Sequence, residues 1–207
     1  IANPNCSTIQ LVMALKPIHD KYGINRLIIS TYQSVSGTGY KAVNQLNGER
    51  EGHVEDKAYP HQIDKNCIPH CDDFLDTGYT KEEMKMLWET QKIMGDQSIL
   101  VNATAVRVPV FYGHAEAIHL ETRSPIDAQH VKELLADAPG VTVYDGNEQF
   151  PTQVSSASGN DIVHVGRIRN DITHPCGLNL WVVSDNIRKG AATNSIQIAE
   201  TLIRDYL

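Results

Sequence analysis

The alternation of short β-type runs with amphipathic helical segments constrains this 207-residue chain more than any other feature. Clusters of apolar, β-branched and aromatic residues predict strands at 26–33, 98–110, 114–123, 141–144, 162–169 and 178–184. Helical periodicity predicts helices at 6–16, 40–48, 80–94, 127–137 and 188–206. Strands and helices interleaved in this way predict an α/β fold, with a mixed sheet and helices packed on one face.

Several local signals mark the element boundaries. Asn5 or Ser7 can cap the first helix, which Pro17 is expected to end. Thr80 followed by Glu83 has the spacing of a capping box. Residues 49–79 are rich in proline, glycine and polar groups, so we expect a long excursion with little regular structure. The strands at 98–110 and 114–123 are expected to be joined by a turn at Gly113.

Composition and charge exclude several classes of partner. The net charge is −7, with acids spread along the chain, which argues against a nucleic-acid partner. No stretch approaches the roughly 20 apolar residues of a membrane helix, so we expect neither a membrane partner nor secretion, but a cytoplasmic protein. The four cysteines are expected to be free thiols. Because the first residue is isoleucine, we expect a fragment of a longer chain.

Cys6 is a candidate nucleophile because it lies at the start of a predicted helix. The positive end of the helix dipole and unsatisfied backbone N–H groups stabilise a thiolate there. Cys6 is therefore expected to react faster than Cys67, Cys71 and Cys176. A small buried residue beside a proline turn is the alternative, and the placement alone does not decide between them.

Arg107 and His114 flank the segment 108–113 and can converge on one pocket. Histidine is suited to proton transfer near neutral pH, and arginine binds carboxylates through two parallel hydrogen bonds. Glu82 and Lys85 share one face of a predicted helix. The ordinary alternatives are a strand-end histidine with a surface arginine, and an exposed intrahelical salt bridge.

Two further patterns are weaker. The segment SGTGYKA at 36–42 superficially matches a dinucleotide-binding fingerprint, but no acidic residue ends a second strand about 20 positions later. A glycine turn that lines an active site is the better interpretation. His61, Cys67, His70 and Cys71 have the right number for zinc but unusual spacing, so we expect no metal there.

Together, these segments resemble one family, the aspartate-β-semialdehyde dehydrogenases. Its nucleophile segment resembles ANPNCST at 2–8, and its glutamine segment resembles STYQSVSG at 30–37. Its substrate-binding helix is similar to KEEMK at 81–85, and its arginine and histidine pair to RVPV at 107–110 with GH at 113–114. Its last strand and closing helix are similar to GLNLWVV at 177–183 and DNIRKGAA at 185–192. The matches occur in the same order along the chain.

The resemblance implies an NADPH-dependent reduction of L-aspartyl-4-phosphate to L-aspartate-4-semialdehyde, a step in the biosynthesis of lysine, threonine, methionine and isoleucine. It implies the following roles: Cys6 as the nucleophile that forms a thioacyl intermediate, His114 as the acid/base, Gln33 as the residue that orients the substrate, Arg107 as the carboxylate ligand, Glu82 as the ammonium ligand, Lys85 as the phosphate ligand, and Ser36, Gly37 and Asn186 as nicotinamide contacts.

The resemblance also implies the domain organisation. Residues 1–187 would form a catalytic and dimerisation domain with a mixed, largely antiparallel sheet, as in glyceraldehyde-3-phosphate dehydrogenase-like enzymes. Residues 188–207 would form a helix that packs on an N-terminal NADP-binding domain, which is missing here. A homodimer is implied, and the fragment alone is expected to be inactive. The alternatives are an N-acetyl-glutamyl-phosphate reductase, which the segment at 2–8 and the Glu82/Lys85 helix disfavour, and a non-catalytic dimerisation module.

Overall fold

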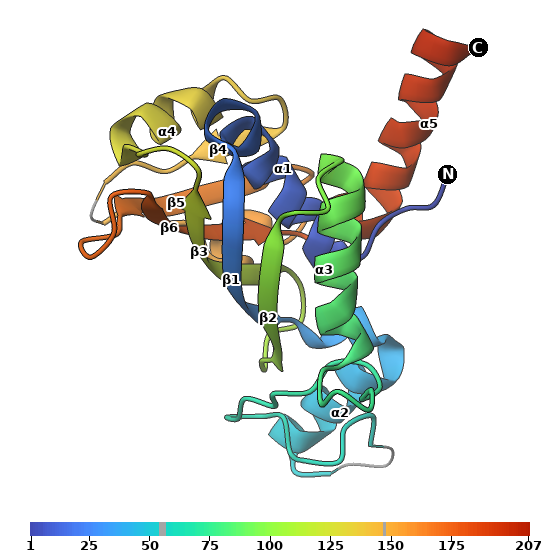
Figure 1. Cartoon of the computed structure of the whole chain (residues 1–207). Coiled ribbons are helices and arrows are strands. Elements are labelled where there is room, and N and C mark those ends of the chain that lie inside the picture. Colours follow the sequence, from blue (N-terminus) through green and yellow to red (C-terminus); the bar gives the residue numbers. More distant parts are fainter. Residues whose placement is uncertain (54–56, 147) are drawn as a thin grey trace.

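A six-stranded mixed sheet forms the centre of the computed structural model, which describes residues 1–53, 57–146 and 148–207 (Figure 1). The strands are β1 (Ile24–Gln33), β2 (Leu100–Arg107), β3 (His114–Thr122), β4 (Val141–Val143), β5 (Val163–Asn170) and β6 (Gly177–Ser184). Their order is β2-β1-β3-β6-β5-β4. The two outer pairs are parallel and the central pairings are antiparallel, which confirms the predicted sheet.

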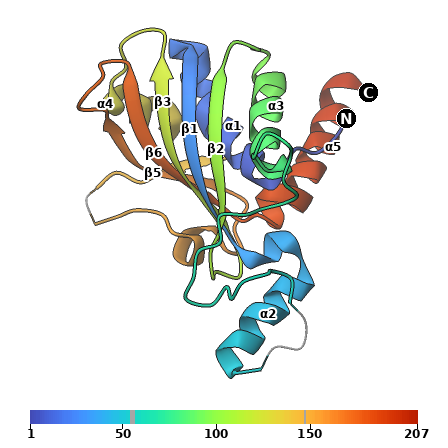
Figure 2. The same ribbon diagram turned by 60° about the horizontal axis from the view of Figure 1, so that its bottom comes forward.

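Three helices cover one face of this sheet: α1 (Cys6–Tyr22), α3 (Lys81–Met94) and α4 (Ala128–Ala136) (Figures 1 and 2). Along β1, Leu27 and Ile29 are buried beneath the helices, whereas Ile28 between them is 38% exposed on the opposite, open face. Each fully buried leucine or isoleucine contributes about 1.5–3 kcal/mol. Helices on one face were predicted, and the alternation along β1 explains why one face stays open.

Helix α1 begins where the sequence predicted and ends later. The Asn5 side chain accepts hydrogen bonds from the backbone N–H groups of Ser7 and Thr8, so Asn5 is the cap. The predicted end at Pro17 is wrong, because α1 continues to Tyr22. A proline inside a helix removes one backbone hydrogen bond. Complete burial of Ile18 in the main core holds the last turn despite that loss.

The strands β2 and β3 follow each other in the chain but are not neighbours in the sheet, because β1 lies between them. The connection at 108–113 runs past the end of β1 instead of forming a tight turn. The N–H of Val108 donates to the Gln33 carbonyl, and the N–H of Val35 donates to the Val110 carbonyl. These long-range bonds place the segment after β1 against the segment after β2.

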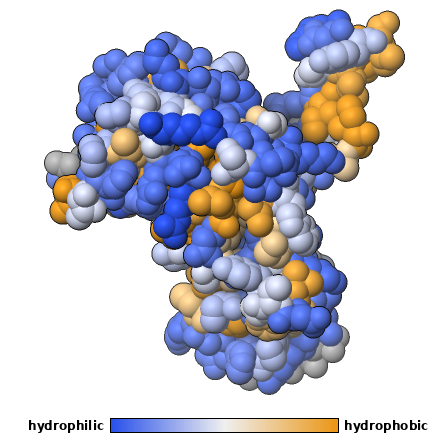
Figure 3. Space-filling view, in the orientation of Figure 1, coloured by the Kyte–Doolittle hydropathy of each residue, from blue (hydrophilic) through white to orange (hydrophobic). Residues whose placement is uncertain are grey.

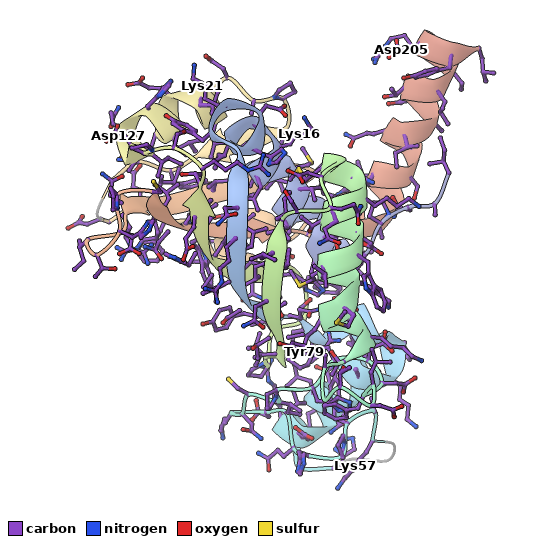
Figure 4. All side chains as sticks on the ribbon, viewed as in Figure 1. Lys16, Lys21, Lys57, Tyr79, Asp127 and Asp205 are labelled. Atoms are coloured by element: carbon purple, nitrogen blue, oxygen red, sulfur yellow. The ribbon has the colours of Figure 1, made fainter. Side chains whose placement is uncertain are left out.

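A small lobe projects below the sheet (Figures 1 and 2). It contains a short 3₁₀ turn, Val35–Thr38, then α2 (Tyr40–Glu51), and the irregular stretch 57–79. The predicted helix end near Gly48 was too early, because α2 continues to Glu51 and is capped by Gly52, whose φ of 85° suits glycine. The lobe has its own core, which includes Leu46, Tyr59 and Ile63. Lys57 marks its far end (Figure 4).

The C-terminal segment leaves the body of the molecule. After a π-type turn, Arg188–Ala192, helix α5 (Thr193–Tyr206) extends outward, with Asp205 near its tip (Figure 4). No residue of α5 is buried, and its apolar side chains Ile196 and Ile203 are 59% and 66% exposed. Figure 3 shows this apolar surface along α5. Among the described residues, no helix combines the length and apolar character needed to cross a bilayer.

Candidate active site

The strand register brings three predicted site residues into one row across the sheet, where β1 and β2 end and β3 begins. Gln33, the last residue of β1, pairs with Arg107 on β2 and with His114 on β3. Residues in register point to the same face of a sheet. All three side chains face the helices and are buried, with exposed fractions of 1%, 5% and 0%. The predicted convergence of these residues therefore occurs, although they lie far apart in sequence.

The N-terminal ends of α1 and α3 bring two more predicted residues to this row. Glu82, in the first turn of α3, accepts hydrogen bonds from Gln33 Nε2 and from Asn5 Nδ2, each at 2.9 Å. Asn5 immediately precedes Cys6, and its backbone N–H donates to Glu89 at 2.8 Å. A continuous set of contacts thus joins the start of α1 to Gln33 through Glu82.

Gln33 is held in one orientation. Its Oε1 accepts the Thr31 hydroxyl at 3.0 Å, and its Nε2 lies 3.5 Å from His114 Nε2 as well as donating to Glu82. Because Thr31 and Gln33 are two residues apart on one strand, they share a face. This period is visible in the sequence, and it is the signal that could have identified Thr31.

The guanidinium of Arg107 is buried and is available to an anion. Its Nη1 donates to the Ser34 carbonyl at 2.8 Å, while its Nε has no hydrogen-bond partner among the described residues. It forms no ion pair with a carboxylate in the described part of the chain. Gly37 leaves the space beside it open, since a Cβ there would lie 2.9 Å from Arg107 Nη1 and 3.0 Å from the His114 ring.

His114 is a neutral imidazole in this environment. Burial is the largest cause, and the positive charge of Arg107 adds to it, so the pKa of His114 is lowered to about 3. The backbone N–H of Ser34 donates to Nδ1 at 3.1 Å. Ser34 was not a predicted site residue. Its contact with His114 depends on how β1 and β3 pair, which no local pattern reveals.

The surroundings of the Cys6 thiol oppose the activation that the helix start is expected to provide. Burial, followed by the negative charge of Glu82, raises the pKa of Cys6 to about 12. Arg107 and the nearby backbone N–H groups lower it, but they do not offset the loss of solvation. The thiol is therefore protonated at neutral pH, and faster alkylation than the other cysteines does not follow from its pKa.

Lys85 lies at the margin of the site. Its Nζ is 2.7 Å from Asp72 and 3.7 Å from Glu82, and its side chain is 38% exposed. The hydrogen bond that Lys85 donates to Asp72 raises the pKa of Lys85, so the ammonium is charged. The intrahelical pair with Glu82 that the spacing predicts is present, and it places the Lys85 charge next to the site rather than on a remote surface.

The predicted nicotinamide contacts lie beside His114. Asn186 Nδ2 donates to Ser36 Oγ at 3.0 Å, and Asn186 Oδ1 accepts the Gly113 N–H at 2.8 Å. Both side chains are buried, at 5% and 7% exposed. The glycine turn that contains Gly37 opens α2, which leads into the irregular lobe rather than into a parallel strand. The turn is therefore part of the site and not of a dinucleotide-binding unit.

The cysteines of the lobe have different surroundings. Cys67 is exposed, whereas Cys71 is buried and hydrogen-bonds with Arg107. Within the described residues, no group of three histidine, cysteine or acidic side chains is arranged to hold a metal ion. No role at the site was predicted for Cys71 from the sequence. Its contact with Arg107 arises from the bridge between Ile68 and Arg107, which only the tertiary structure shows.

Fold and site together define an α/β domain in which a partly buried thiol lies with a buried imidazole and a buried guanidinium at one end of the strands. The chain belongs to the semialdehyde dehydrogenase dimerisation-domain family, whose model matches residues 15–189.

Similar proteins are longer than this chain. An aspartate-semialdehyde dehydrogenase of Shewanella violacea is 60% identical over 211 residues, which cover 100% of this chain and 62% of that relative. The chain thus spans about three-fifths of its length. Aspartate semialdehyde dehydrogenase II of Vibrio cholerae, complexed with ASA, has a TM-score of 0.96 and 58% identity over 100% of this chain and 63% of its own. The enzyme of Candida albicans with NADP has a TM-score of 0.74 and 28% identity over 98% of this chain and 57% of its own.

Proposed function

We propose that this chain is the catalytic and dimerisation part of an enzyme that reduces L-aspartyl-4-phosphate to L-aspartate-4-semialdehyde and releases phosphate. The observation that carries the proposal is the row of Arg107, Gln33 and His114, with Cys6 and Glu82 brought to it by two helix starts. The 60% identity to an aspartate-semialdehyde dehydrogenase supports the same activity.

The charges of the site suit a small amino acid that carries a phosphate. The Arg107 guanidinium has no carboxylate partner among the described residues and can bind the α-carboxylate through two hydrogen bonds. Glu82 is placed to bind the α-ammonium group. Lys85 lies 3.7 Å from Glu82, so it can meet the phosphate if that group displaces Asp72. These cations are local, on a chain whose net charge is −7.

The chemistry proposed for the site is acyl transfer to sulfur followed by reduction. The Cys6 sulfur bonds to the acyl carbon, the carbon–oxygen bond to phosphate breaks, and the thiol proton leaves with the phosphate. NADPH, when bound, supplies the hydride that reduces the thioester. The carbon–sulfur bond then breaks, the aldehyde leaves and the sulfur regains a proton. Gln33 orients the acyl group, and His114 acts at its oxygen.

The residues present fit one end of the cofactor. Gly37 lets the backbone approach a flat ring closely, since even a Cβ there would press on Arg107 and His114. Ser36 and Asn186 flank the same turn. The remainder of NADP would be bound by an N-terminal domain outside this chain. The exposed apolar side of α5, with Ile196 and Ile203, would dock on that domain. Domain boundaries at 1–187 and 188–207 and a cytoplasmic location stay predictions.

The open face of the sheet is the proposed homodimer interface. It carries Ile28 on β1 and Leu100 on β2, both exposed. Figure 3 shows an apolar patch over this part of the sheet. Nearby, a cavity of about 490 Å³ is bordered by Phe150 and Trp181. Contiguous exposed apolar surface marks association sites, and the matching family is a dimerisation domain.

Ile28→Asp is expected to convert the dimer to a monomer, because it buries an unpaired carboxylate at the centre of the interface. Analytical ultracentrifugation of the full-length protein measures the change. The matched control is Ile172→Asp, at a fully exposed position in the turn between β5 and β6. An Ile28→Asp protein that remains dimeric would place the interface elsewhere.

The proposed activity is tested by the reverse reaction of the full-length protein. NADP reduction with L-aspartate-4-semialdehyde should require phosphate, because phosphate must release the thioacyl group. N-acetyl-glutamate semialdehyde is the competing substrate. Its preference would support an N-acetyl-glutamyl-phosphate reductase, and no turnover of either aldehyde would support a non-catalytic module. The isolated chain is expected to be inactive.

A further inference from the structure

Glu116 is a buried acid that the proposed mechanism does not use. It lies on β3 two residues after His114, so both side chains point to the face of the sheet that the helices cover. Glu116 is completely buried, and its register partners, Thr31 on β1 and Val182 on β6, are uncharged. Ile118, the next residue of β3 on this face, belongs to the main core. Glu116 therefore lies where the row of site residues meets the apolar core.

The surroundings of the Glu116 carboxyl group do not suit a negative charge. Neither of its oxygens has a hydrogen-bond partner among the described residues. The buried side chains of α1, which packs on β3, are all uncharged. The titratable groups on the surrounding elements are His114 on β3, Cys6 at the start of α1 and Glu82 on α3. The one whose charge acts on Glu116 is Glu82, so an ionised Glu116 would be buried beside a like charge.

Glu116 is therefore expected to carry a proton at neutral pH. Burial is the largest cause that raises the pKa of Glu116, to about 8; the Gln10 amide opposes the rise, and the negative charge of Glu82 adds to it. The geometry leads to the same conclusion, because a buried carboxylate without partners is so costly that the group takes up a proton instead.

The protonated carboxyl group suits the polar atoms of α1. Gln10 lies one turn after Cys6 on α1 and is close enough to lower the pKa of Glu116, although the two side chains are not within hydrogen-bond distance. Gln10 Nε2 and Ser7 Oγ lie on the same side of α1 and also lack hydrogen-bond partners among the described residues. A carboxylic acid offers a donor and an acceptor, whereas a carboxylate only accepts. A short movement would therefore let Glu116 accept from the amide and donate to the hydroxyl, which would tie the first turns of α1 to β3.

Loss of this proton would disturb the proposed site in two ways. A buried charge without a partner is expected to draw water between α1 and β3, which would displace the turns that carry Cys6. It would also add a second negative charge near Glu82, where an anionic substrate must bind. Displacing a reacting group by about 1 Å can lower a rate about 100-fold. The proton on Glu116 thus affects the nucleophile without contact between Glu116 and the substrate.

We propose that Glu116 is an uncharged carboxylic acid in the working enzyme and a positioning residue for Cys6, because it holds the first turns of α1 on β3. Loss of its proton at alkaline pH weakens this contact and lowers turnover. The effect on turnover rests on the proposed function, whereas the protonation state of Glu116 does not.

Infrared spectroscopy of the full-length protein tests the protonation state directly. Exposed carboxyl groups are ionised at pH 7, so a C=O stretching band of a protonated acid reports a buried one. We expect this band in the wild type and in the matched control Glu121→Gln, whose side chain lies on the same strand and is 28% exposed, but not in Glu116→Gln. The band should lose half its intensity near pH 8. A wild-type spectrum without the band at pH 7 would overturn the proposal.

Unfolding gives a second measurement that needs no turnover. The ordinary pKa of a glutamate is 4.5, so near pH 6.5 Glu116 is ionised in the unfolded chain and protonated in the folded one. The contribution of Glu116 to stability is therefore full below about pH 4.5 and is lost as the pH rises to about 8. From the pH dependence of unfolding, Glu116→Gln should release about one proton fewer than the wild type at pH 6.5, and Glu121→Gln the same number. Equal release by wild type and Glu116→Gln would contradict a protonated Glu116.

Turnover of the full-length protein should follow the same ionisation. At pH 9, about one unit above the pKa of about 8, roughly nine-tenths of Glu116 is ionised, so kcat of the wild type should be about 10-fold lower than at pH 7. Glu116→Gln should keep its kcat over this range, because an amide does not ionise. The same alkaline fall in both proteins would show that Glu116 does not control turnover.

Glu116→Leu separates the hydrogen bonds of Glu116 from its charge. Leucine is neutral but forms no hydrogen bond, so kcat at pH 7 should fall about 10- to 100-fold at unchanged KM for the aldehyde. Glu116→Gln should stay within about 3-fold of the wild type, because its amide keeps a donor and an acceptor. Equal kcat in the wild type and Glu116→Leu would overturn the positioning role. If Glu116→Leu does not fold, the comparison of the wild type with Glu116→Gln at pH 7 and pH 9 decides.

Discussion

Replacing Cys6 with alanine is expected to lower kcat of the full-length protein by at least about 10⁴-fold, because a covalent intermediate cannot form. The wild-type protein mixed with L-aspartate-4-semialdehyde and NADP, without phosphate, should accumulate a thioacyl adduct on Cys6. Mass spectrometry of the quenched protein detects this adduct. Its absence from the alanine variant would link the lost turnover to the lost nucleophile.

The control for this experiment is Cys176→Ala. Cys176 accepts a hydrogen bond from Thr122 through its carbonyl, so it lies at the opposite end of β3 from His114. Its substitution should leave kcat and the adduct unchanged. Turnover by Cys6→Ala within 10-fold of wild type, or an adduct located on Cys71, would assign the nucleophile to a different residue.

Replacing Arg107 with leucine is expected to raise KM for L-aspartate-4-semialdehyde about 100-fold, which corresponds to about 3 kcal/mol. The guanidinium is 5% exposed, so its bonds to a carboxylate form away from water and are strong. Arg107→Lys should recover only part of this loss, because an ammonium group cannot form the paired bonds of the guanidinium. Steady-state kinetics with varied aldehyde measure both effects.

The matched control is Arg123→Leu. Arg123 is half-exposed and pairs with Asp96 at 2.6 Å, far from the row of site residues. Its loss should leave KM unchanged. An aldehyde without the α-carboxylate should react equally well with wild type and Arg107→Leu. If that analogue still distinguishes the two proteins, Arg107 acts mainly through its bond to the Ser34 carbonyl rather than on the substrate.

Local signals in the sequence predicted most elements. The Asn5 cap and the capping box of Thr80 with Glu83 are both present, because capping depends on residues within one helical turn. Strand positions also agree, since an apolar run bounded by turn residues is a local pattern. The end of α1 was missed at Pro17, where burial of Ile18 outweighs a local penalty.

The sequence indicated which residues are candidates for the site, but it did not predict how their side chains contact one another. The resemblance to a family supplied Cys6, Gln33, Glu82 and Arg107, and the structure brings them together. Ser34 and Asn5 were not predicted as site residues, because their contacts span 80 and 77 residues of sequence. The effect of desolvation on the pKa of Cys6 could not be predicted from the sequence, since desolvation depends on every neighbour that excludes water.

The sequence by itself determined the α/β class and the helix starts, because these depend on periodicity and on residues a few positions apart, and its resemblance to a family indicated the candidate site residues. Only the tertiary structure decided that β1 lies between β2 and β3, which aligns Arg107, Gln33 and His114 in one row. Strand register and burial depend on many contacts between segments that are distant in sequence, and no local sequence pattern encodes those contacts.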